Sequence, residues 1–247
     1  MKTSQFMNSV LFALLMLSSI EARGVLYTSI PGVFSTGVDD SGSLLSVGSI
    51  DPHWSIVASP VGSSAPKVTD PFYMWLGNTP SSEWINGGGS SNYSPPAGVY
   101  DFTLTFSLAG FDPSTAQISG QWASDNESDI YLNGLDTGIS NSGIAPWGFS
   151  NFTSFTLTDG FVAGENTLTF AVTQDPDNVQ VNPTGLQVDI LSAVAAVPEP
   201  GPLALVGIAG LCWVASASFR RNHMSSMGSN KSAERVIPLG VSNSYFY

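Results

Sequence analysis

Alternation of apolar and polar residues is the dominant pattern in the middle of the chain. From residue 100 to residue 108, apolar side chains fall at every second position, with aspartate, threonine and serine between them. The same alternation recurs over residues 167–173 and 186–190. Because successive side chains of a strand point to opposite faces, each segment is predicted to be a strand with one buried and one solvent face.

Six further short segments are predicted to be strands, and residues typical of turns separate them. They are residues 25–30, 54–58, 72–76, 118–122, 130–132 and 152–157. No helical periodicity of useful length appears between residues 24 and 196. About nine short strands with one polar face each are typical of two packed sheets. The sequence therefore predicts an all-β domain over residues 24–196, an antiparallel β-sandwich of jelly-roll-like type.

An apolar segment near each end of the chain predicts passage through a membrane. Near the N-terminus, Lys2 precedes an apolar run at 10–17 and a small-residue cleavage site at 20–22. That run is too short to span a bilayer, so residues 1–23 are predicted to be a cleaved signal peptide.

The C-terminal segment, residues 203–219, carries only Ser216 and Ser218 as polar side chains and has no polar helical face. As a helix it would be about 26 Å long, slightly less than the bilayer core, which predicts a single, weakly anchored transmembrane helix.

The distribution of charge predicts the same topology. Between residues 24 and 219, Lys67 is the only basic residue, against 17 carboxylates, whereas Lys2, Arg23, Arg220 and Arg221 flank the apolar segments. Basic residues beside membrane segments stay on the cytoplasmic side, so the middle of the chain is predicted to lie outside. One basic side chain in this region also argues against binding to nucleic acid or to an anionic membrane surface.

A proline-flanked glutamate precedes the C-terminal apolar segment. Together with that segment and the basic pair behind it, it resembles the PEP-CTERM sorting signal of bacterial exported proteins, here residues 197–221. The matching residues are Val197, Pro198, Glu199, Pro200, Arg220 and Arg221. The resemblance implies recognition by an exosortase, a membrane-embedded cysteine-type transpeptidase, and export to the cell surface or the exopolysaccharide matrix. Residues 222–247 continue beyond the signal, either as a cytoplasmic tail or as a spurious extension from a misread frame.

A second resemblance lies within residues 99–191. The run Asp129-Ile130-Tyr131-Leu132-Asn133-Gly134 and the segment 161–168 resemble pieces of galactose-binding-like jelly rolls. Each piece also has a local physical interpretation. Asn133-Gly134 is a favoured two-residue hairpin turn because both residues tolerate positive φ, and Gly164 can turn the chain into the next strand.

The sequence offers little chemistry for catalysis. His53 is the only histidine before the C-terminal apolar segment, and no nucleophile motif accompanies it. Its place between Pro52 and Trp54 favours a structural role at the start of a strand. The single cysteine, Cys212, lies inside the apolar segment. We therefore predict that the protein is not an enzyme.

Carboxylates are the other candidate chemistry. Asp125, Glu127 and Asp129 would line one face of an extended strand, but a glycosidase needs two carboxylates facing each other across a cleft. No cofactor is expected, and calcium is the alternative because oxygen ligands could gather in loops. The candidate ligands are Asp39, Asp40, Asp125, Glu127, Asp129, Asp175 and Asp177. None matches a calcium-loop pattern, which favours solvated charges on loops and edges.

Three tryptophans, Trp75, Trp84 and Trp147, could form a platform for carbohydrate, because flat aromatic faces pack on sugar rings. The alternative is that they are core or loop-anchoring residues. The function predicted from the sequence is a non-enzymatic protein of the cell surface or extracellular matrix, associated with exopolysaccharide or biofilm. The alternatives are a carbohydrate-binding module and a calcium-stabilised adhesin.

Overall fold

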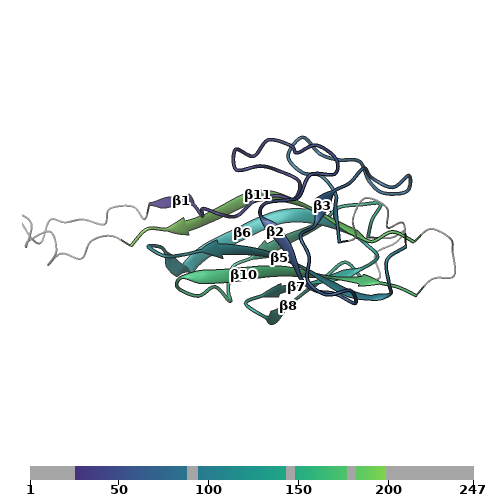
Figure 1. The fold of residues 1–247 in the computed structure, drawn as a ribbon. Helices are drawn as coiled ribbons and strands as arrows, with labels where there is room; N and C mark the ends of the chain where they lie inside the picture. Colours follow the sequence, from purple (N-terminus) through teal and green to yellow (C-terminus); the bar gives the residue numbers. More distant parts are fainter. Residues whose placement is uncertain (1–25, 88–93, 143–147, 177–181, 199–247) are drawn as a thin grey trace, which may run out of the picture. The chain divides into compact units, whose positions relative to one another are not determined.

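The strands of the protein form two antiparallel sheets in a computed structural model that describes residues 26–87, 94–142, 148–176 and 182–198 (Figure 1). The six-stranded sheet has the order β3 (Lys67–Val68), β4 (Ile85–Asn86), β11 (Gly185–Ala196), β6 (Asp112–Asp125) and β9 (Thr153–Leu157), with β1 (Tyr27–Ser29) paired to β11. The five-stranded sheet has the order β2 (Trp54–Ala58), β5 (Gly98–Ser107), β10 (Glu165–Gln174), β7 (Ser128–Leu132) and β8 (Leu135–Ser140). The predicted antiparallel sandwich is confirmed.

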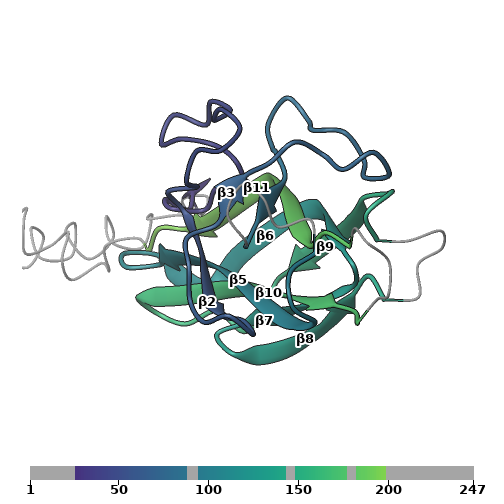
Figure 2. The ribbon, with the colours of Figure 1, turned by 45° about the vertical axis from the view of Figure 1, so that its right-hand side comes forward.

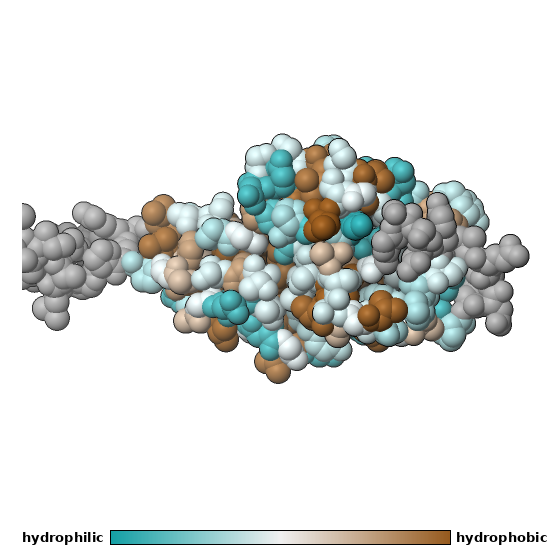
Figure 3. Space-filling model, in the orientation of Figure 1, coloured by the Kyte–Doolittle hydropathy of each residue, from teal (hydrophilic) through white to brown (hydrophobic). Residues whose placement is uncertain are grey.

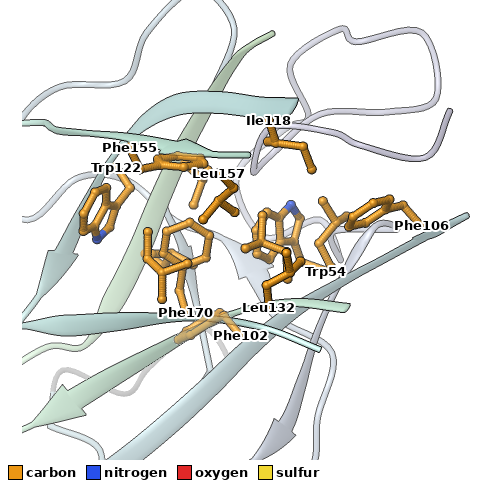
Figure 4. Close-up of a cluster of buried hydrophobic side chains, with 14 of the residues drawn as sticks. Trp54, Phe102, Phe106, Ile118, Trp122, Leu132, Phe155, Leu157 and Phe170 are labelled. Atoms are coloured by element: carbon orange, nitrogen blue, oxygen red, sulfur yellow. The ribbon is translucent and has the colours of Figure 1, made fainter. Parts of the chain in front are cut away.

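The core lies between the two sheets, and its apolar side chains point inward from both (Figure 4). Trp122 and Phe155 of the six-stranded sheet meet Phe170 of the five-stranded sheet, with ring centroids 5.9 and 5.7 Å apart. These separations are within the range that edge-to-face and tilted aromatic pairs prefer. On the side shown in Figure 3, apolar residues are scattered among polar ones, which is normal for a surface in water.

Most of the predicted strands are present. The segment 54–58 coincides with β2, and the alternating segments belong to β5, β10 and β11. The strands that the sequence did not predict are β3, β4 and β8. Two of these are only two residues long, so they offer too few positions for alternation to be recognised.

The prediction of a strand at residues 72–76 is wrong, because this segment is a loop. Within it, the Trp75 N–H donates to the Phe72 carbonyl oxygen at 2.7 Å, which closes a tight turn. The apolar side chains that suggested a strand are buried outside the sandwich core, where Phe72, Trp75 and Leu76 form a second cluster with Trp84. The aromatic residues of segment 72–76 therefore favoured a strand in the sequence, although they pack in a loop cluster.

The two predicted turns are confirmed. Asn133 and Gly134 have φ of 53° and 76° and join β7 to β8, with Leu132 opposite Leu135. The Asn133 side chain also ties this turn to β10, because its Oδ1 accepts the Thr167 N–H at 3.0 Å. Gly164, with φ of 85°, immediately precedes β10.

Between β6 and β7 the chain crosses from one sheet to the other. Asp125 is the last residue of β6 in the six-stranded sheet, whereas Asp129 belongs to β7 in the five-stranded sheet. The expectation that Asp125, Glu127 and Asp129 line one face is wrong, because no single strand contains them. Buried hydrogen bonds fix the crossing: the Asn141 amide donates to Ser124 Oγ at 2.8 Å, and its Oδ1 accepts the Ser128 N–H at 2.6 Å.

Both ends of the described chain leave the sandwich side by side. In β1, Tyr27 lies opposite Ala196 of β11, and the Val197 N–H donates to the Leu26 carbonyl oxygen at 3.0 Å. The predicted signal peptide, most of the sorting signal and the tail lie outside the described residues. Within residues 26–198, as far as they are described, no helix has the length and hydropathy needed to cross a bilayer.

Candidate functional site

The outer faces of the two sheets differ. Residues 69–84, here called the loop layer, pack against the outer face of the six-stranded sheet, where Trp75 and Trp84 bury Ala123 of β6. The loop layer is also hydrogen-bonded to this sheet, since the Gln187 amide of β11 donates to the Ser82 carbonyl oxygen at 3.1 Å. In Figure 2 the long loops lie on the side of β3 and β11. The outer face of the five-stranded sheet lies on the opposite side of the sandwich.

The tryptophans proposed as a carbohydrate platform do not form one in this structure. Trp84 is 0% exposed and Trp75 is 8% exposed, and their rings stack at a centroid distance of 4.1 Å. The indole N–H of Trp84 is also used internally, because it donates to the Leu76 carbonyl oxygen at 2.9 Å. Burial leaves neither ring a face for a sugar, and Trp147 lies outside the described residues.

A buried carboxyl group holds the loop layer to β6. The Trp75 indole N–H donates to Asp125 Oδ2 at 2.7 Å, and the Thr184 hydroxyl donates to the Asp125 carbonyl oxygen at 2.8 Å. Burial is the main cause that raises the pKa of Asp125 to about 7; the Trp75 hydrogen bond lowers this pKa, and the nearby Asp175 adds a smaller increase. Asp125 is therefore part of the scaffold, where its protonation affects stability.

His53 has the structural position predicted for it, directly before β2. Asp51 organises this strand start: its Oδ1 accepts the N–H groups of His53 and Trp54 at 2.9 and 3.1 Å, and its Oδ2 accepts the Gly37 N–H at 2.7 Å. The His53 ring stacks on Phe34 at 3.7 Å. In these contacts His53 has a structural role, with its backbone hydrogen-bonded to Asp51 and its ring packed on Phe34.

The described calcium candidates do not gather into one site. Asp39 Oδ1 accepts hydrogen bonds from Ser41 and from the Ser43 N–H, and these bonds lower the pKa of Asp39. Asp125 is buried under Trp75, whereas Asp129 lies on the other sheet, and Asp177 is outside the described residues. Within the described ranges, no three aspartate, glutamate, histidine or cysteine side chains form a group that could hold a metal ion.

The outer face of the five-stranded sheet is rich in hydroxyl groups, and we call it the open face. On its three central strands the outward residues are Val99, Asp101, Thr103, Thr105, Ser107, Glu165, Thr167, Thr169, Ala171, Thr173, Asp129 and Tyr131. Strand pairing arranges them in rows. Thr103, Thr169 and Tyr131 form one row, in which Thr103 is only 4% exposed and its hydroxyl lies 2.8 Å from that of Thr169.

Carboxylates surround Tyr131 on the open face. Asp136 of β8 lies opposite Tyr131, and Asp129 is two residues before it on the same face of β7. In the adjacent row, Asp101 and Asp129 flank Ala171 of β10. They are separated by two inter-strand spacings, about 10 Å. Burial raises the pKa of Asp101, the most enclosed of these three carboxyl groups.

Sequence reasoning missed Tyr131 as a candidate binding residue. The signal was present, because Ile130 and Leu132 are inward-facing apolar residues and the residue between them must point outward. In the sequence, Tyr131 lies within the run 129–134 that resembles galactose-binding-like jelly rolls. Trp84 and Trp147 are the stronger candidates from sequence, because they lie in segments rich in glycine, serine and proline, and binding residues are common in loops.

Comparison with known proteins gives distant similarity in structure only. No family model matches the chain, and no curated protein matches it. One similar solved structure is a mutant of a carbohydrate binding module family 29 (9% identity, TM-score 0.33, covering 70% of this chain and 93% of that one). Another is a family 35 carbohydrate binding module from an environmental isolate (9% identity, TM-score 0.30, 71% and 99%). A third is CBM35 from Paenibacillus barcinonensis (18% identity, TM-score 0.28, 50% and 91%). At these values the similarity carries no argument about a ligand.

Proposed function

We propose that this chain is an exported, non-enzymatic protein whose β-sandwich binds polysaccharide through the open face. The observation that carries the proposal is the difference between the two sheets. The loop layer covers the outer face of one sheet and buries its tryptophans there, whereas the other sheet presents rows of hydroxyl groups around Tyr131.

The open face has the chemistry that a sugar chain requires. A tyrosine ring can pack on the apolar face of a pyranose, and its hydroxyl supplies a polar handle. Threonine hydroxyls both donate and accept hydrogen bonds, as sugar hydroxyls do. Because these side chains stand on paired strands, their spacing is fixed before binding, and little conformational entropy is lost when the ligand binds.

Exchange of Tyr131 for alanine tests the proposal. We expect Tyr131→Ala to weaken binding of the purified full chain on a glycan array by about tenfold or more, the effect of losing one well-packed aromatic contact. Tyr73→Ala is the matched control, because Tyr73 is 84% exposed on the loop layer. Equal binding by the two variants, or no glycan bound by the unchanged protein, would refute the proposed function.

Export remains part of the proposal. It is supported by the two apolar terminal segments, by the asymmetric charge, and by the resemblance of residues 197–221 to a sorting signal. The partner would be an exosortase-like membrane transpeptidase, and the destination the cell surface or extracellular matrix. Mass spectrometry of the mature protein should give a C-terminus within residues 197–200, and recovery of intact Tyr247 would contradict processing at this site.

A further inference from the structure

The charges on the open face define which polysaccharide it would bind. Asp101, Asp129 and Asp136 lie around Tyr131 and Ala171, on four adjacent strands. Lys67 is the only basic residue within the described ranges, and it belongs to β3 of the other sheet. The negative potential of the open face is therefore not balanced by any described cation on its own sheet.

This potential favours one class of glycan over the others. A uronic-acid polymer would place its carboxylates against those of the protein, and like charges held together cost free energy. A neutral glycan can donate hydroxyl hydrogen bonds to the three carboxylates, but it carries no charge opposite to theirs. An ammonium group would be attracted by the carboxylates and by the face of the Tyr131 ring, which is a favourable site for a cation.

We infer that the open face binds a polysaccharide of amino sugars that carry free ammonium groups, an inference that rests on the proposed function. Tyr131 packs on a sugar ring, and Asp129 and Asp136, which lie beside it, receive ammonium groups of the chain. Asp101 lies across Ala171 from Asp129, about 10 Å away, so it receives a second ammonium group instead of sharing the first.

The test compares four polymers against the purified full chain by calorimetry. They are polyglucosamine, its fully N-acetylated form, a neutral β-glucan and polylysine. We expect polyglucosamine to bind at least about tenfold more tightly than the acetylated form and the glucan, and to weaken as salt is added. The double variant Asp101→Asn/Asp129→Asn should lose about tenfold in affinity for polyglucosamine, because it removes two carboxylate–ammonium pairs and keeps the shape of both side chains. Asp70→Asn, on the loop layer, is the matched control.

Each alternative outcome has a defined meaning. Equal affinity for the glucan and polyglucosamine, both lost in Tyr131→Ala, would overturn the amino-sugar inference and leave glycan binding intact. Polylysine binding as tightly as polyglucosamine would show attraction of any cationic polymer and would overturn it too. Polyglucosamine binding that is unaffected by both Tyr131→Ala and the double aspartate variant would refute the open face as the site, and the proposed function with it.

Discussion

Replacing Asp125 by asparagine should raise the free energy of unfolding by about 4 kcal/mol at pH 8 and leave it nearly unchanged at pH 4. Asp125 is 4% exposed, and burial raises its pKa in the folded protein to about 7. An asparagine keeps an oxygen that can accept the Trp75 indole N–H and has no charge to desolvate. The stabilisation is therefore the cost of ionising this carboxyl group in the folded state.

The direction of the pH dependence follows from proton binding. Between about pH 4 and pH 7 the folded state holds the Asp125 proton and the unfolded state does not, so stability falls as pH rises through this window and levels off above it. Urea unfolding at intervals from pH 4 to pH 8 measures the slope. The control is Asp129→Asn, because Asp129 is an exposed carboxylate on the open face. This variant should keep the same slope of unfolding free energy against pH. Parallel stability curves for the protein and Asp125→Asn would refute the buried, protonated state.

Trp84→Ala should destabilise the protein by about 3–5 kcal/mol, the usual cost of removing a large buried aromatic side chain. Trp84 is fully buried, stacks on Trp75 and donates its indole N–H to the Leu76 carbonyl oxygen. Its loss would open a cavity beneath the loop layer and leave that carbonyl group without its donor. Thermal unfolding followed by circular dichroism measures the effect.

Tyr73→Ala provides the comparison for Trp84→Ala, because Tyr73 is on the same loop layer and is exposed. Its removal should change stability by no more than about 0.5 kcal/mol. A Trp84→Ala protein that keeps its stability and loses glycan binding would contradict the account, because it would place Trp84 in a binding site after all.

The sandwich could be predicted from the sequence because each strand carries its own alternation of buried apolar and exposed polar residues. In β10, threonines alternate with Leu168, Phe170 and Val172, and this pattern identifies the buried face whatever the neighbouring strands are. The turn at Asn133-Gly134 was equally local, since positive φ depends on the residue itself. Features of this kind need no knowledge of the tertiary structure.

The candidate site could not be predicted in the same way, because it depends on where a loop packs. Nothing local in residues 72–76 shows that they cover the outer face of a sheet and bury Trp75 and Trp84 there. The crossing after Asp125 likewise separates Asp125 from Asp129, which the sequence places only four residues apart. Which face is covered, and thus which is open, is a property of the assembled sandwich.

If the open face is the ligand-binding surface, ligand should perturb its strands and leave the loop layer unchanged. Nuclear magnetic resonance of the labelled full chain, titrated in turn with a glucosamine hexamer and a glucose hexamer, distinguishes the two surfaces. We expect amide shifts to change along β5, β10 and β7, around Thr103, Thr169 and Tyr131. Changes confined to the loop layer, or no change with either hexamer, would contradict this role of the open face.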